Sequence, residues 1–241
     1  MSNITVLNNV DHADLKVQIN SADNTFIHVN RSQVYASEIS ELQKEFPLLI
    51  YRDDKTEQLQ LHAILGLSKD ENLFLCEQGW TTRYAPALLA RGPFSIGFTK
   101  SDTGETNAPM ICVDTADPRV NTTQGEAVFL PMGGESPYLQ YVKKALQTIE
   151  SGAKYNKTLF SLITEMNLLE SVSIEIKLSD TEQVSLSHYY TINEQRLSAL
   201  EPESLQKLSQ YGMLGSLYFL LSSMGNFNRL IELKNAKSAL Q

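Results

Sequence analysis

Apolar positions in the first 130 residues mostly alternate with polar ones or form short runs, and both patterns are typical of strands. Alternation at Leu15, Val17 and Ile19 predicts a first strand, and residues 26–29 predict a second. Further strands are predicted by the apolar runs at residues 48–51, 59–67, 73–76, 94–98 and 109–114.

Helical periodicity interrupts this part of the chain twice. Ile39, Leu42 and Phe46 share one helical face, so a helix is predicted over residues 34–46. Pro47 ends it, because proline has no amide hydrogen and disfavours helical geometry in the residue before it. A second helix is predicted over residues 83–91, with Pro86 in its first turn.

After about residue 130 the helical period dominates. Ser136-Pro137 predicts the N-terminus of a helix that runs to about residue 170, with Gly152 as a point where it bends or breaks. Alternation over residues 172–178 and 184–190 then predicts a β-hairpin. A helix starting near Pro202 and a last helical region, broken around Gly225-Asn226, complete the chain.

These elements predict an α+β fold in a single domain over residues 1–241. Residues 1–130 are expected to be strand-rich, with a mixed or antiparallel sheet. Residues 131–241 are expected to be helix-rich, with one hairpin. The most apolar segment, Met213 to Leu221, favours a buried core helix. The alternative is a helix face that joins copies of the chain in a homo-oligomer.

Composition narrows the functional classes. The chain carries 20 Lys and Arg against 28 Asp and Glu, a formal net charge of −8, which argues against sequence-independent binding to nucleic acid or to an anionic membrane. The start of the sequence lacks the features of a signal peptide, and no segment approaches the ~20 apolar residues of a membrane span. We therefore expect a cytoplasmic protein, without stable membrane insertion.

Cys76 and Cys112 lie in short apolar runs. Both are expected to be small buried hydrophobic side chains, and a disulfide between them is left open.

The sequence contains no fingerprint of a known catalytic class, and no cofactor or metal is expected. One weak pattern is His12-Ala13-Asp14, the spacing used by non-haem iron sites, with His188 as a distal ligand. The favoured interpretation of these residues is solvated or capping polar groups. An enzyme of unfamiliar, metal-dependent type therefore remains only the alternative to a binding protein.

The segment from Leu67 to Phe94 is the best candidate for a recognition surface. It contains the single tryptophan, Trp80, together with Arg83, Tyr84 and Arg91. Aromatic rings beside guanidinium groups suit recognition, because arginine stacks on rings and donates hydrogen bonds in a planar fork. On a helix over residues 83–91, Tyr84 and Arg91 would share one face. The competing interpretation is that the rings close the core and the arginines pair with nearby acids.

Several short segments, in order and spread over nearly the whole chain, resemble the SapC family of bacterial proteins, which is named for surface-layer (S-layer) gene systems. The segments are Val6-Leu7-Asn8, Asp11-His12-Ala13-Asp14-Leu15, Ala36-Ser37-Glu38, Glu45-Phe46-Pro47, His62-Ala63-Ile64-Leu65-Gly66-Leu67, Glu71-Asn72-Leu73-Phe74, Gly79-Trp80, Tyr84-Ala85-Pro86-Ala87, Arg91-Gly92-Pro93-Phe94, Cys112-Val113-Asp114, Ser136-Pro137-Tyr138-Leu139, Leu217-Tyr218, Gly225-Asn226 and Arg229-Leu230.

The resemblance implies S-layer or export biology and an accessory role. Together with the acidic balance, the absence of catalytic fingerprints and the cluster of arginine and aromatic residues, it favours a non-enzymatic accessory protein of a bacterial envelope, S-layer or uptake system. Such a protein would recognise a peptide, a protein partner or a small acidic ligand. The family has no settled catalytic residues that could be transferred to positions in this sequence.

Overall fold

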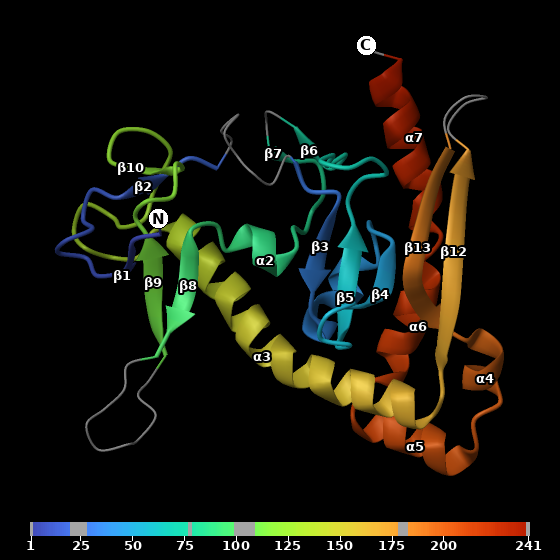
Figure 1. The fold of residues 1–241 in the computed structure, drawn as a ribbon. Coiled ribbons are helices and arrows are strands. Elements are labelled where there is room, and N and C mark those ends of the chain that lie inside the picture. The colour runs from blue at the N-terminus through green and yellow to red at the C-terminus, as the bar shows by residue number, and fades with distance from the viewer. Residues whose placement is uncertain (1, 20–27, 77–78, 99–108, 178–182, 240–241) are drawn as a thin grey trace. The chain divides into compact units, whose positions relative to one another are not determined.

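The computed structural model describes residues 2–19, 28–76, 79–98, 109–177 and 183–239, and Figure 1 shows their course. The chain packs as two compact units, each made of several segments. The first unit comprises residues 1–25, 77–79 and 87–147, and the second comprises residues 26–76, 80–86 and 148–241. The mixture of helices and antiparallel sheets confirms the predicted α+β class, whereas the single domain remains a prediction.

Two small antiparallel sheets form the first unit. One has the order β1-β9-β8 and the other the order β10-β2-β11. Their strands are β1 (Ile4–Val6), β2 (Lys16–Val17), β8 (Phe94–Gly97), β9 (Met110–Asp114), β10 (Val120–Asn121) and β11 (Glu126–Ala127). Val17, Phe94 and Val113 form a core with Val142 and Leu146 of the helix that follows.

That helix, α3 (Pro137–Glu165), begins where the sequence predicts it. Ser136 Oγ accepts a hydrogen bond from the Leu139 amide at 3.1 Å, and Pro137 is the first helical residue. Gly152 does not break α3, which continues through it to Glu165. Its role is close packing, since a Cβ atom there would lie 2.4 Å from Tyr35 Cβ.

A five-stranded antiparallel sheet of order β12-β13-β4-β5-β3 organises the second unit. Its strands are β3 (Arg31–Val34), β4 (Leu48–Arg52), β5 (Leu59–Ile64), β12 (Leu169–Lys177) and β13 (Gln183–Ile192). The predicted hairpin is therefore β12–β13, and β13 joins it to β4 (Figure 1). The chain also has two short strands on either side of residues 77–78, β6 (Leu75–Cys76) and β7 (Gly79–Trp80).

The helix predicted over residues 34–46 is much shorter in the structure. Val34 is extended and pairs with Leu61 in the sheet, and a 3-10 turn over Ala36–Glu38 leads into α1 (Ile39–Leu42). The predicted buried face is nevertheless correct, because Ile39, Leu42 and Phe46 are all buried. The sheet pairing of Val34 outweighs the local helical pattern at the start of this segment.

Four helices end the chain: α4 (Glu194–Ser198), α5 (Pro202–Gln210), α6 (Leu214–Ser223) and α7 (Asn226–Ser238). The predicted break at Gly225-Asn226 separates α6 from α7. A second break lies at Gly212, whose φ of +68° is the left-handed conformation that ends helices.

Helix α6 packs against β4 and β13, and it buries Leu217 and Leu220. The core-helix interpretation expected burial on most sides. One side of α6 is exposed, however, since Tyr218 is 45% exposed and Phe219 is 38% exposed. An oligomer contact through this helix remains a prediction.

Cys112 is buried in β9, as expected, but Cys76 is exposed in β6. Both are free thiols, so they are not joined by a disulfide in the structure.

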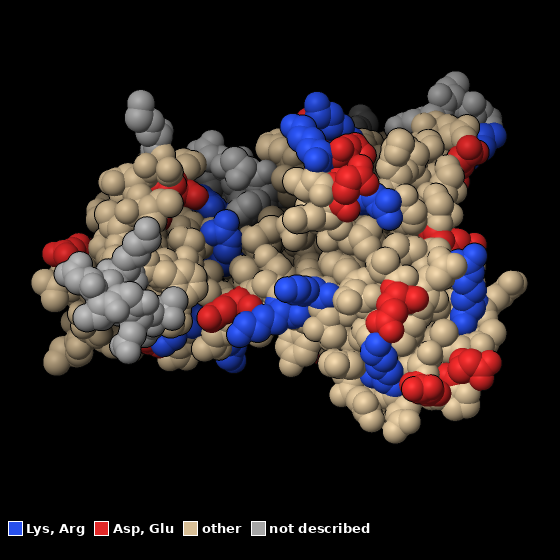
Figure 2. Space-filling view, turned by 60° about the horizontal axis from the view of Figure 1, so that its bottom comes forward, with Lys and Arg blue, Asp and Glu red and all other residues tan. Residues whose placement is uncertain are grey.

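Among the described residues, no helix combines the length and the apolar character needed to cross a membrane. On the face drawn in Figure 2, Lys and Arg side chains lie among Asp and Glu rather than in one broad basic area. This distribution agrees with the acidic composition.

Candidate functional site

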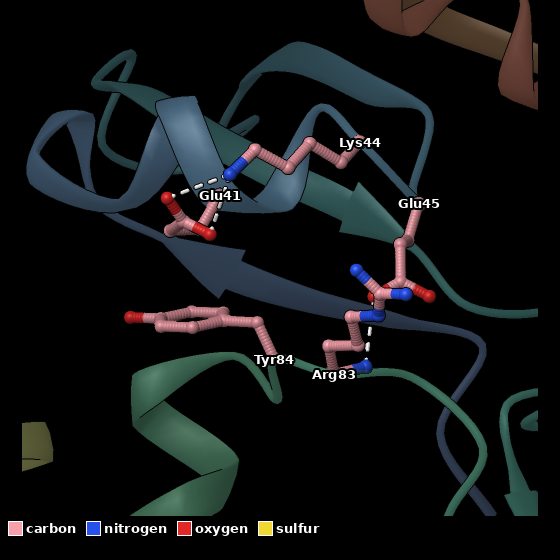
Figure 3. A pocket seen from close by; sticks show the side chains of 5 residues that line it. All are labelled: Glu41, Lys44, Glu45, Arg83 and Tyr84. Atoms are coloured by element: carbon pink, nitrogen blue, oxygen red, sulfur yellow. Dashed lines mark hydrogen bonds and ion pairs between the residues drawn. The ribbon is translucent and has the colours of Figure 1, made fainter.

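A surface hollow of about 380 Å³ in the second unit contains two of the four predicted site residues. It lies between α1 with the turn that follows it and the loop over residues 81–86 (Figure 3). We call it the Arg83 pocket, and it is lined by Glu41, Lys44, Glu45, Arg83 and Tyr84.

One wall of the Arg83 pocket is an ion pair on the α1 side. Lys44 Nζ lies 2.8 Å from both carboxylate oxygens of Glu41. Both side chains are about half exposed, so the pair contributes little to stability. For the pocket, the consequence is that the positive charge of Lys44 and the negative charge of Glu41 neutralise each other.

The carboxylate of Glu45 has a partner at each oxygen. The backbone N–H of Arg83 donates to Oε1 at 2.8 Å, and Arg229 Nη1 donates to Oε2 at 3.1 Å. The Glu45 side chain is only 15% exposed, so these bonds are shielded from water. Glu45 therefore fixes the backbone of the loop at Arg83, and its charge is matched by Arg229.

Tyr84 is held by a buried acid behind the pocket. Its hydroxyl donates to Glu38 Oε2 at 3.2 Å, and the Tyr35 amide donates to Glu38 Oε1 at 2.9 Å. Glu38 is 1% exposed. The ring of Tyr84 is thereby kept in the wall of the pocket, opposite Glu41 (Figure 3).

The guanidinium of Arg83 is the charge that remains. Its side chain is exposed, and within the described chain no residue forms a hydrogen bond or ion pair with it. In Figure 3 the dashed line at Glu45 runs to the backbone nitrogen of Arg83 and not to its guanidinium. A planar donor with five N–H groups, fixed at its backbone, is suited to bind a carboxylate through two parallel hydrogen bonds.

Trp80 packs against Phe46, the residue after Glu45, and does not line the Arg83 pocket. Its ring packs edge-on against Phe46, with centroids 6.5 Å apart, and Phe46 in turn packs against Phe74 at 4.6 Å. Phe46 and Phe74 are completely buried. The packing interpretation of the sequence therefore describes the contacts of Trp80.

Arg91 belongs to the first unit, whereas the Arg83 pocket belongs to the second. The helix predicted over residues 83–91 is only α2 (Ala87–Ala90), so Tyr84 and Arg91 lie outside it and do not share a helical face. Arg91 Nη1 donates to the carbonyl of Phe94, a bond that closes the turn after α2.

Of the three residues of the alternative metal site, His12 and Asp14 belong to the first unit and His188 belongs to the second. The imidazole of His12 has local partners, the Asn8 amide at Nδ1 and Thr5 Oγ1 at Nε2, both at 3.3 Å. Within the part of the chain that the structure describes, no group of three or more His, Cys, Asp or Glu residues is placed to hold a metal ion.

A second polar cluster lies on the five-stranded sheet, around His62. The imidazole is 6% exposed and stacks on Tyr51, with ring centroids 5.2 Å apart. Arg31 lies over the same Tyr51 ring and donates to the Tyr189 hydroxyl at 2.7 Å. Burial, reinforced by the positive charge of Arg31, lowers the pKa of His62 to about 4, so the ring is neutral near neutral pH.

Sequence reasoning found Arg83 and Tyr84 but missed the acidic side of the pocket. Glu45 stands beside Phe46-Pro47, and this tripeptide is one of the segments that resemble the SapC family. Glu38 likewise falls in such a segment. Those segments are the signal that could have pointed to both acids, although their contacts with the loop over residues 81–86 appear only in the fold.

Comparison with known protein families gives one match. A model described as SapC matches residues 7–230, which is most of the chain and spans both units. The chain belongs to the SapC family. No curated protein and no solved structure matches it. The matched region of this SapC-family chain includes every residue of the Arg83 pocket as well as Trp80, Arg91 and Arg229.

Proposed function

We propose that this SapC-family chain is a non-enzymatic accessory protein that binds a peptide or protein partner of a bacterial envelope, S-layer or uptake system. The Arg83 pocket is the recognition point, and it receives a carboxylate of the partner. Membership in the SapC family supports the envelope setting of the proposal, and the charges of the Arg83 pocket support the binding of a carboxylate.

The observation that carries the proposal is the matching of charges in the pocket. Glu41 is paired with Lys44, and Glu45 is paired with Arg229. The guanidinium of Arg83 is thus the charge for which the described residues offer no counterpart. A carboxylate ligand would give the Arg83 guanidinium its own ion pair. A cationic ligand would instead have to displace one of the existing ion pairs.

Tyr84 adds a second element of recognition. Its ring forms one side of the hollow while its hydroxyl is held by Glu38. An aromatic face beside a guanidinium binds a planar group such as a peptide unit or a ring, and tyrosine and arginine are enriched among the residues that dominate binding energy. The preferred ligand is therefore a carboxylate next to a planar group, as in an acidic residue of a peptide.

Site-specific photocrosslinking in native cells tests this function. A photoreactive residue at the exposed Ser40, adjacent to Glu41, is expected to capture a defined envelope protein. Its yield should fall about tenfold in an Arg83→Ala background, because a charge-assisted hydrogen bond is lost. The matched control is Ser161, an exposed serine that lines a different hollow on α3. Equal adducts from Ser40 and Ser161, or no effect of Arg83→Ala, would contradict the proposal.

A further inference from the structure

Helix α7 holds the segment that forms the acidic side of the Arg83 pocket. Asn226 Nδ2 donates to the carbonyls of Gln43 and Phe46, at 2.8 and 3.0 Å. One turn later along α7, Arg229 reaches Glu45 Oε2 at 3.1 Å. Helix α7 therefore fixes both the backbone and the carboxylate of this segment.

Arg229 is itself held in place on its other side. Its guanidinium lies over the ring of Phe74, 5.6 Å from the centroid, and Phe74 is fully buried. A cation over a buried aromatic ring is favourably placed, and its remaining donors can still form hydrogen bonds. Arg229 is thus oriented toward Glu45 by packing rather than by the ligand, and it is not among the residues that line the pocket.

The position of Glu45 creates a competition between two arginines. Arg83 already donates its backbone N–H to Oε1, so its own side chain starts close to the same carboxylate. Without Arg229, Oε2 would lack its cationic partner. The flexible side chain of Arg83 would then gain from folding back to form the ion pair itself.

We propose that Arg229 is a positioning residue for the Arg83 pocket. By occupying Glu45 Oε2, it keeps the Arg83 guanidinium available to a carboxylate ligand. The inference rests on the proposed function for its ligand, although the arrangement of the two arginines can be measured without one. It assigns helix α7, near the C-terminus, a role in ligand selection at a pocket that it does not line.

The first test is NMR of the arginine side chains in the full chain without ligand. In the wild type, the Nε–H signal of Arg83 should exchange rapidly with water, because none of the described residues forms a hydrogen bond or ion pair with the guanidinium. In Arg229→Gln, we expect slower exchange and a shifted signal as Arg83 pairs with Glu45. An unchanged Arg83 signal in Arg229→Gln would overturn the inference.

The second test uses an acetylated and amidated Gly-Glu-Gly tripeptide as the carboxylate probe. Arg229→Gln should weaken its binding about tenfold, the loss expected when a charge-assisted hydrogen bond must first be broken. The double variant Glu45→Gln/Arg229→Gln should restore binding, because it removes the competing carboxylate. Lys237→Gln, on the same helix and away from Glu45, is the matched control and should bind as the wild type does.

The outcomes separate the inference from the function on which it rests. Binding of the probe by the wild type, with no loss in Arg229→Gln, would contradict the role of Arg229 alone. Failure of the double variant to recover, with the fold intact, would also overturn it. No response of the wild type to the probe, together with the expected change in the Arg83 signal, would contradict the proposed function alone.

Discussion

The side chain of Asn156, on α3, accepts a hydrogen bond from the backbone amide of Ala36 at 2.7 Å, although the two residues are 120 positions apart. The same side chain donates to the carbonyl of Val34. These bonds join α3 to the turn between β3 and α1, and α1 carries Glu41. The geometry of the Arg83 pocket therefore depends on a buried amide that lies far from it in the sequence.

Asn156→Ala should destabilise the protein by about 1–3 kcal/mol, because it leaves the buried backbone amide of Ala36 without its partner and removes a further bond to the carbonyl of Val34. Asn156 is 8% exposed, so water does not readily replace the lost bonds. Equilibrium unfolding in urea measures the effect. The neighbouring exposed Lys157→Ala is the control and should change stability by less than about 0.5 kcal/mol. Equal effects of the two substitutions would show that the buried bonds contribute nothing.

Gly152→Ala should also destabilise, although alanine favours helix more than glycine does. The added Cβ would lie 2.4 Å from Tyr35 Cβ, so α3 and the segment before α1 must move apart. We expect a cost of about 1–3 kcal/mol. Gly215→Ala provides the opposite case, since a Cβ there meets no atom within 4 Å. That substitution should stabilise α6 by about 0.5–1 kcal/mol. A stabilising Gly152→Ala would refute the packing role of this glycine.

Stability should fall as the pH is lowered, because His62 is buried in its neutral form. The pKa of His62 is lowered to about 4 by burial and by Arg31, so protonation favours the unfolded chain, whose histidines titrate at an ordinary pKa of 6.5. Between these two values the unfolded state binds more protons. The neutral His62 thus contributes its full stabilisation above about pH 6.5, and this stabilisation is lost as the pH falls from 6.5 toward 4.

The expected loss from His62 between about pH 7.5 and pH 5 is about 2 kcal/mol, measured as the free energy of unfolding. His62→Phe keeps a ring against Tyr51 and removes the titrating group, so it should lose this part of the pH dependence. The exposed His188→Asn should retain it. If His62→Phe and the wild type lose the same stability on acidification, His62 is not the group responsible.

Trp80→Ala should lower stability by about 3 kcal/mol, because it removes a large ring packed against Phe46. Arg83→Ala should change stability by less than about 0.5 kcal/mol, since the Arg83 side chain is exposed. Thermal unfolding of both variants checks the contrast. The reverse order of effects would mean that the assignment of one residue to packing and the other to recognition is wrong.

Local sequence patterns correctly predicted those helices and strands that are determined by neighbouring residues. Alternation predicted the hairpin β12–β13, and Ser136-Pro137 predicted the start of α3. The pattern failed at Val34, because its extended conformation depends on pairing with Leu61 in β5. It also failed at Gly152, because the reason for that glycine is a contact with Tyr35.

The candidate site was predictable only in part for the same reason. Arg83 and Tyr84 stand in a segment rich in arginine and aromatic residues, so composition alone could single them out. Glu45 meets the Arg83 amide across 38 positions, and Arg229 meets Glu45 across 184. No local spacing rule connects residues at such separations, and the fold is needed to show that these charges neutralise one another.

The most direct test of carboxylate recognition is a heteronuclear NMR titration of the wild type with two acetylated and amidated tripeptides, Gly-Glu-Gly and Gly-Gln-Gly. They differ only in the charge of the central residue. The Arg83 side chain and the Tyr84 ring should shift with the glutamate peptide, at least about tenfold more tightly than with the glutamine peptide. Arg83→Ala should abolish this preference. Equal responses to both peptides, or shifts confined to residues outside the Arg83 pocket, would contradict carboxylate recognition at this site.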